Sequence, residues 1–163
     1  MINTNDFRNG MSMLGSAVSI VTTTYENNHY GMTVSAVCSV TDDPPTLLVC
    51  INRNAWSHDF LISSGVLCVN VLSSSHQELS SDFANKSLSM ANRFKSHKWS
   101  TLHTGSPALD EALVNFDCEI TEVSTSGTHS VLFAQIKKMR SGKSTSGLIY
   151  FNRKYHVIPE LTL

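Results

Sequence analysis

GMTVSAVCSVTDDPPTLLVCIN, residues 31–52, is the stretch that most constrains the fold. β-Branched residues dominate both of its halves, and the Asp-Asp-Pro-Pro run at 42–45 favours a turn between them. The stretch therefore predicts two strands, over 30–40 and 46–51, joined by a tight connection.

Three hydroxyl residues stand out in the first of these strands. Alternation places Thr33, Ser35 and Ser39 on one face, because successive side chains of a strand point to opposite sides. One interpretation is the exposed polar face of an antiparallel sheet. The other is a row of hydroxyls and backbone N–H groups that binds a polar ring edge or a phosphate.

Further strands and two short helices flank this stretch. Asn5 or Asp6 is expected to cap a helix that ends at Gly15, and Ser75-x-x-Glu78 has the form of a capping box that opens a second helix. Many strands at short spacing with few helices predict a mainly β fold, an antiparallel barrel with a few peripheral short helices. The other predicted strands are 18–24, 66–72, 114–123, 130–140, 147–151 and 154–158.

Length and charge narrow the class of protein. A chain of 163 residues predicts a single domain over 1–163. The net charge of −1 and the lack of a long apolar run indicate no nucleic-acid partner, no membrane and a cytoplasmic, soluble protein. The four cysteines lie far apart in apolar runs, so we expect reduced, buried thiols and no metal site.

The hairpin predicted over 116–139 has an unusual turn. FDCEITEV (116–123) and VLFAQIKKM (131–139) alternate as strands, with Gly127, Thr128 and His129 between them. His129 either caps the hairpin with a hydrogen bond to the backbone or lies across the face of a bound ring. Gly127 permits the turn and Thr128 can hold it by a side-chain bond.

Several motifs together resemble the flavin reductase family. They are FRNGMSMLGSAVSIVTT, GMTVSAVCSVTDDPPTLLVCINR, LCVNVLSSSHQELSSDFA, the Arg93-Phe94 pair, GTH at 127–129 and GLIYFNRKYH at 147–156. Within the family the chain is most similar to the reductases of pyrimidine utilisation and of 4-hydroxyphenylacetate 3-monooxygenase. The resemblance implies a split antiparallel β-barrel of the FMN-binding type, with FMN or FAD bound at a homodimer interface.

The resemblance also implies the residues of the site. His129 should lie at the nicotinamide and orient it during hydride transfer, without exchanging a proton. Flavin contacts are expected from Thr33, Val34, Ser35, Ala36, Ser39 and Val40. The ribityl chain and phosphate should follow Cys50, Ile51, Asn52, Asn54, Ala55 and Ser57, with Phe83 and Arg93 nearby.

Structural alternatives exist for several of these side chains. Arg93 is either a surface arginine at a helix end or a phosphate ligand, whose guanidinium suits that partner. Asn52 can cap a turn, Cys50 can offer only its backbone, and Phe83 can belong to the core. Packing is also the default for the tryptophans, Trp56 and Trp99.

The function implied is an NAD(P)H-dependent flavin reductase that takes free flavin and NADH or NADPH and supplies reduced flavin to a separate oxygenase. This chemistry needs no acid or base from the protein, which fits the absence of a Ser/His/Asp order or paired carboxylates in the sequence. The alternatives are a non-catalytic flavin-binding electron carrier or sensor, and a flavin-free interaction barrel.

Overall fold

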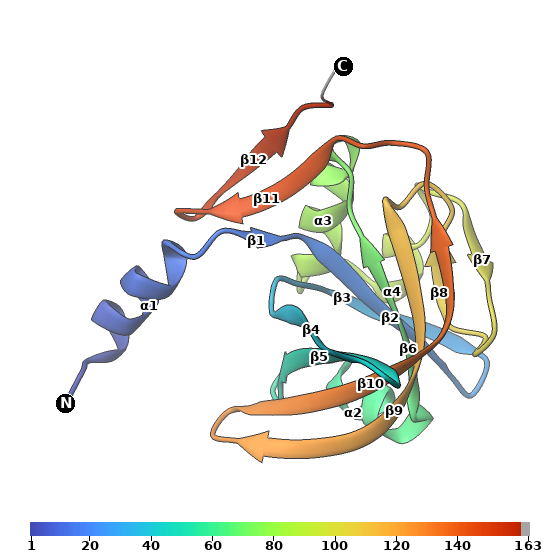
Figure 1. Ribbon diagram of the computed structural model, residues 1–163, viewed down its shortest axis with the longest axis horizontal. Coiled ribbons are helices and arrows are strands. Elements are labelled where there is room, and N and C mark those ends of the chain that lie inside the picture. The colour runs from blue at the N-terminus through green and yellow to red at the C-terminus, as the bar shows by residue number, and fades with distance from the viewer. Residues whose placement is uncertain (161–163) are drawn as a thin grey trace.

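The computed structural model describes residues 1–160, drawn in Figure 1. The helices are α1 (Thr4–Ser12), α2 (His58–Ser64), the 3-10 helix η1 (Ser74–His76), α3 (Gln77–Ala84) and α4 (Met90–Arg93). The strands are β1 (Ser16–Ala17), β2 (Ser19–Tyr25), β3 (Asn28–Val34), β4 (Val37–Asp42), β5 (Pro45–Asn52), β6 (Val66–Val71), β7 (Trp99–Thr101), β8 (Pro107–Leu109), β9 (Val114–Ser126), β10 (His129–Ser141), β11 (Gly147–Phe151) and β12 (Lys154–Ile158).

A large antiparallel sheet forms the body of the protein. Its strand order in the described residues is β3-β2-β6-β9-β10-β5-β4, so its two edge strands follow each other in the chain. Only Ser35 and Ala36 connect them, a span of about 11 Å at most from Val34 to Val37. The sheet must therefore curl until its edges approach, which confirms the split barrel and puts the split at Ser35–Ala36.

The predicted strand 30–40 is wrong in one respect, because it is two strands. The chain leaves β2 after Val34 and pairs with β5 from Val37 onwards, and the Cys50 N–H donates to the Ala36 carbonyl at 3.0 Å. Thr33 and Ser39 consequently lie on opposite edge strands and do not share a face. β-Branched residues on both sides of the break favour strand equally, so the sequence does not reveal the change of partner.

Two hydrophobic cores lie on either side of β2. Val21 belongs to the core inside the barrel, which includes Val49, Ile51 and Leu132. Its neighbour Ile20 belongs to a second core that contains Phe83, Leu79 and Leu148. β2 is buried on both faces for this reason. A small sheet of order β1-β11-β12 and the β7–β8 pair cover the second core.

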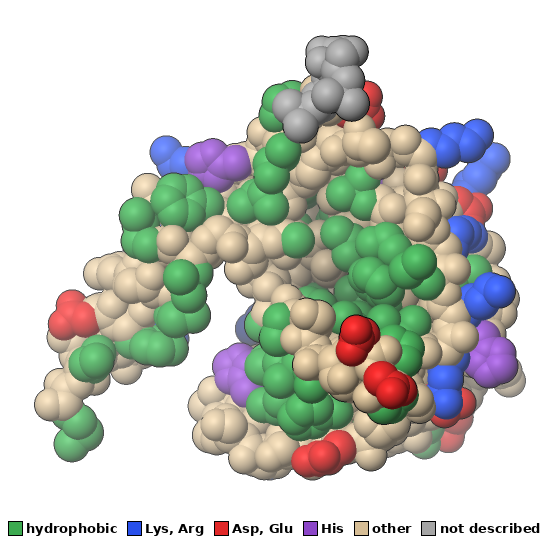
Figure 2. All heavy atoms as spheres, viewed as in Figure 1, with side chains coloured by type: hydrophobic (Ala, Val, Ile, Leu, Met, Phe, Trp, Pro, Cys, Tyr) green, Lys and Arg blue, Asp and Glu red, His purple; other side chains and the backbone are tan. Residues whose placement is uncertain are grey.

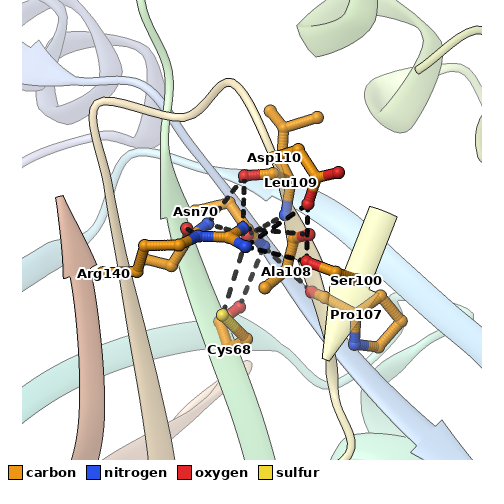
Figure 3. Close-up of polar contacts among 9 residues, drawn as sticks. Cys68, Asn70, Ser100, Pro107, Ala108, Leu109, Asp110 and Arg140 are labelled. Atoms are coloured by element: carbon orange, nitrogen blue, oxygen red, sulfur yellow. Dashed lines mark hydrogen bonds and ion pairs between the residues drawn. The ribbon is translucent and has the colours of Figure 1, made fainter. Parts of the chain in front are cut away.

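A polar network ties β7–β8 to the large sheet (Figure 3). Asn70, fully buried in β6, accepts the Leu109 N–H at 2.8 Å and donates to the Ile20 carbonyl at 3.0 Å. Arg140 donates to the Leu109 carbonyl at 3.0 Å and pairs with Asp110 at 3.3 Å. Because these groups satisfy one another, the network is structural.

The two predicted helices form with different caps. Asn3, not Asn5 or Asp6, caps α1, and it accepts the Asp6 N–H at 2.8 Å. The capping box at η1 joins Ser73 and His76 instead of Ser75 and Glu78. α1 has no buried residue and extends away from the barrel (Figure 1).

The β9–β10 hairpin confirms the predicted turn, with longer strands than expected. Gly127 has φ +54°, a conformation that glycine adopts readily.

The four cysteines are free, but only Cys68 and Cys118 are buried. Cys38 is exposed and Cys50 is half-buried, so the prediction that all four thiols are buried is wrong for these two. Burial raises the pKa of Cys118 to about 12. None of the helices in residues 1–160 has the length and apolar character that crossing a membrane requires.

Candidate functional site

Three cavities follow one another along the split. The first, about 610 Å³, lies between β3, the β5–α2 loop and the α3–α4 segment. It shares Thr33 with a second cavity of about 320 Å³, which shares Ser35 with a third of about 480 Å³ beside α1. Figure 2 shows the hollow between α1 and the barrel. Together they form a continuous groove of the size that small-molecule sites have.

The first cavity carries positive charge. Lys86 and Arg93 line it, and no Asp or Glu does so in the part of the chain that the structure describes. Its hydroxyl groups come from Thr33, Ser57, Ser87 and Ser89. Two cations, the Ser87 and Ser89 hydroxyls and no carboxylate make this end of the groove suitable for a phosphate.

Arg93 is not the surface arginine that one interpretation expected, and its contact with a phosphate stays a prediction. Its side chain is only 6% exposed, and within residues 1–160 no carboxylate pairs with it. Its N–H groups donate to four carbonyl oxygens, of Phe83 (3.0 Å), Asn85 (2.7 Å), Leu88 (3.2 Å) and Gly31 (3.4 Å). Burial lowers the pKa of the guanidinium. Arg93 thus holds the 83–88 segment in place and contributes a positive charge to the cavity.

The loop after β5 supplies the opposite wall. The Asn52 side chain accepts the Asn54 N–H at 2.9 Å, so its turn-capping interpretation is confirmed. Asn54 and Ala55 follow and line the first cavity. Ser57 is buried and donates to the Gly31 carbonyl at 3.0 Å.

Phe83 belongs to the core and also reaches the cavity. It is 1% exposed and lies edge-on to Phe94 and tilted against Trp99. A Cβ at Gly31 would come within 2.8 Å of the Phe83 ring, so only glycine permits this close approach. The core interpretation of Phe83 is confirmed, and so is packing for Trp99.

The middle of the groove lies at the break between β3 and β4. Thr33, Val34 and Ser35 line the second cavity, and Ser35 and Ala36 line the third. The Thr33 hydroxyl donates to the Ser80 carbonyl at 2.6 Å, so only its lone pairs are free for a ligand.

Sequence reasoning missed three groove residues on β11–β12 and their turn. Tyr150 and Arg153 line both the second and third cavities, and Tyr155 lines the second. Tyr155 is held by a 2.8 Å hydrogen bond between its hydroxyl and Ser80 Oγ. Their motif, GLIYFNRKYH, was visible in the sequence, but nothing in it indicated that the small sheet folds over the split.

The remaining predicted residues do not line the groove in this chain. Ser39 and Val40 are exposed on β4, Cys50 is half-buried and Ile51 is fully buried. His129 is exposed at the start of β10, opposite Asn52 in the ladder. Thr128 Oγ1 lies 2.9 Å from its Nδ1, the side-chain bond expected there. Their contacts with flavin or nicotinamide stay predictions.

Beside His129 the structure assembles a Ser/His/Asp chain that the sequence order did not reveal. Ser130 Oγ lies 2.9 Å from Nε2 of His58, and Nδ1 of His58 lies 2.7 Å from Asp59. Ser130 is only 3% exposed, so its hydroxyl cannot reach a substrate as a nucleophile. These hydrogen bonds instead fix the start of β10 to α2. The place lies next to a cavity of about 390 Å³ whose lining includes Gly127 and Thr128.

His76, His97 and Glu111 also meet, with ligand-type atoms within 4.8 Å of one another. The Ser73 N–H donates to Nδ1 of His76 at 3.1 Å, so that nitrogen carries no proton. The proton of the neutral ring is then on Nε2, which leaves no lone pair there for a metal. The tautomer thus argues against a metal ion at this cluster.

Comparison with known proteins identifies the family. Residues 11–159 match the model of the flavin reductase like domain. The chain belongs to the flavin reductase like family. It is 48% identical over 155 residues to the FMN reductase (NADH) RutF of Pantoea ananatis (strain LMG 20103), covering 95% of this chain and 81% of that protein. Identity to the RutF of Variovorax paradoxus (strain S110) is also 48%, over 153 residues, 94% of this chain and 84% of the relative.

Solved structures of flavin reductases share the fold. A solved structure from Haemophilus somnus 129PT superposes with a TM-score of 0.93 at 47% identity and covers 96% of this chain and 100% of that one. BorF, the flavin reductase component of a bacterial two-component tryptophan halogenase, gives a TM-score of 0.90 at 25% identity, over 98% of this chain and 100% of that one. The split barrel is therefore the fold of this family.

Proposed function

We propose that this protein is an NADH-dependent FMN reductase that supplies reduced flavin to a separate oxygenase. The observation that carries the proposal is the 48% identity, over 95% of the chain, to a protein named FMN reductase (NADH). A groove with Lys86 and Arg93 in its first cavity and Arg153 in its second supports it independently, because FMN combines an anionic phosphate with an uncharged ring system.

In this proposal FMN lies along the groove. Its phosphate is bound in the first cavity, near Lys86, Arg93 and Ser57. Its ring follows Val34, Ser35 and the Ala36 backbone at the split, where uncharged groups bind a ring edge without disturbing its redox chemistry. Lys86 and Arg93 in the first cavity and the uncharged residues at the break in the barrel are what support this orientation.

When bound together, the nicotinamide and flavin supply the hydride chemistry themselves. The residues of the chain bind both molecules, orient them and exclude water. His129 orients the nicotinamide, and the buried Ser130–His58 pair keeps the strand that carries His129 in place. A general acid or base is not part of this mechanism.

The active form is a homodimer in the cytoplasm. α1 and the residues just after it expose Phe7 (59%), Met11 (48%) and Leu14 (61%), beside a cavity that Met11 and Leu14 line. A second copy that packs there would cover this apolar surface and would bring its own residues to the groove. The free cysteines fit a reducing compartment. Light scattering that shows a monomer with FMN present would contradict the dimer.

The transfer of reduced flavin is tested by physical separation. The protein and NADH are placed on one side of a dialysis membrane, at low oxygen with FMN, and an unrelated flavin monooxygenase on the other. Turnover of the monooxygenase is expected, because reduced FMN diffuses through the membrane. A tightly held flavin that never leaves would give none and would favour an electron carrier. Parallel assays with FAD and NADPH measure the two preferences.

A further inference from the structure

Trp56 is an exposed aromatic residue in a fixed position. Its side chain is 62% exposed, yet it lines the first cavity together with Lys86 and Arg93. Nearby, the Tyr30 and Phe60 rings stack with their centroids 3.8 Å apart, and the Trp56 ring is steeply inclined to both, at 67° and 78°. The indole therefore rests on an aromatic base while much of its surface faces solvent.

The backbone on both sides of Trp56 is also fixed. The Ala55 N–H donates to the Asn52 carbonyl at 2.9 Å, and the His58 N–H donates to the Ala55 carbonyl at 3.0 Å. A rigid aromatic side chain of this kind binds a planar partner at small entropic cost. An exposed indole at the rim of a cationic cavity suits a flat ring that is linked to phosphate.

We propose that Trp56 is the stacking platform for the adenine ring of NADH. The proposal rests on the proposed function, in which the donor is NADH and the acceptor is FMN. FMN has no adenine, so the dinucleotide brings the one purine ring that the reaction contains. With the nicotinamide at the flavin ring, the diphosphate shares the first cavity of about 610 Å³ with the FMN phosphate, and the adenine reaches its rim where Trp56 stands.

Kinetics with a truncated donor test this assignment. Reduced nicotinamide mononucleotide keeps the reacting ring but lacks the adenosine monophosphate half. Trp56→Ala should lower kcat/KM for NADH by about five- to a hundredfold, the range that base stacking gives. With the mononucleotide the loss should be less than about twofold. Trp56→Phe should recover most of the activity with NADH, because a phenyl ring still stacks.

Met139→Ala is the matched control, since Met139 is a 54% exposed apolar side chain on β10 that lines none of the four cavities described above. It should change neither donor's kinetics. Equal losses of the Trp56→Ala variant with both donors would overturn the platform, as would dissociation of a dimer by this variant, which would make Trp56 a contact between copies.

Equilibrium binding separates this proposal from the proposed function. AMP and ribose 5-phosphate, which lacks the base, are titrated into the wild-type protein and Trp56→Ala. AMP should bind the variant at least about fivefold more weakly, while ribose 5-phosphate should not distinguish the two proteins. If AMP discriminates but NADH is not oxidised, the platform stands and the reductase proposal fails. If AMP binds both proteins equally, the platform is overturned whatever the turnover.

Discussion

Ser57 and Arg93 donate to the same oxygen, the carbonyl of Gly31, from Ser57 Oγ at 3.0 Å and Arg93 Nη1 at 3.4 Å. The three residues come from the β5–α2 loop, α4 and β3, which are far apart in the sequence. This shared acceptor fixes both walls of the cationic cavity to one edge strand of the split barrel. The site is therefore pre-formed rather than assembled by its ligand.

The cationic end predicts a phosphate preference. Lys86→Ala should weaken FMN binding by about three- to tenfold, because it removes one charge from a cavity without carboxylates. Riboflavin, which has no phosphate, should bind the wild-type protein and the variant equally in a fluorescence titration. The Arg93→Lys variant should differ from Lys86→Ala, because it also loses the guanidinium fork that donates to four carbonyls. The free energy of unfolding of this variant should therefore fall by at least about 2 kcal/mol. Equal effects of Lys86→Ala on both flavins would contradict a phosphate site here.

Thr33 predicts a stability effect that Ser39 does not. Thr33→Val removes the 2.6 Å hydrogen bond to Ser80 and leaves that carbonyl without this partner, so unfolding free energy should drop by about 1 to 3 kcal/mol. Ser39→Val alters an exposed position on β4 and should change it by less than about 0.5 kcal/mol. Urea denaturation measures both. Equal losses would mean that Ser39 has a buried role that its exposure does not suggest.

His129→Ala should leave the fold intact, because the side chain is exposed. If His129 orients the nicotinamide, anaerobic reduction of bound flavin by NADH should slow by about ten- to a hundredfold, since small misplacements of reacting groups are costly. Stopped-flow absorbance of the flavin measures this rate. A variant that reduces flavin at the wild-type rate but melts earlier would make His129 a hairpin cap.

His76 predicts acid sensitivity. Burial, with His97 nearby, lowers its pKa below the ordinary value of 6.5, and the Ser73 N–H blocks protonation at Nδ1; Glu111 acts in the opposite direction. Because the folded-state pKa is depressed, its contribution to stability is complete above 6.5 and is lost as the pH falls through the lowered value.

The control is His76→Asn, whose side-chain oxygen can still accept from Ser73 but does not titrate in this range. Urea unfolding at about pH 7.5 and about pH 5.5 should show the wild-type protein losing more stability on acidification than the variant. The same loss in both proteins would assign the acid sensitivity to other groups.

The sequence predicted the strands well because β-branched runs and turn residues mark them locally. The prediction of one strand over 30–40 failed because Ser35 and Ala36 carry the chain from one edge of the sheet to the other. Nothing in the sequence Val34-Ser35-Ala36-Val37 indicates this change. The residues predicted to contact flavin on the two sides of that break therefore lie apart, with Thr33 in the groove and Ser39 outside it.

Long-range contacts limited the site prediction in the same way. The bond from Arg93 to the Gly31 carbonyl, 62 residues away, the Ser130–His58 pair 72 residues apart, and the return of Tyr155 to Ser80 all depend on packing between distant segments. Asn52 and Gly127, by contrast, act through their immediate neighbours, and the sequence predicted both.

Sustained turnover with free flavin tests the central claim most directly. The purified protein is mixed with NADH and a large excess of FMN in air, and the NADH absorbance is followed. A flavin reductase consumes NADH continuously, many equivalents per protein, at a rate that rises with FMN until it saturates. NADH loss that stops after a single equivalent per protein, with excess FMN still present, would contradict the account and leave a flavin-binding carrier in its place.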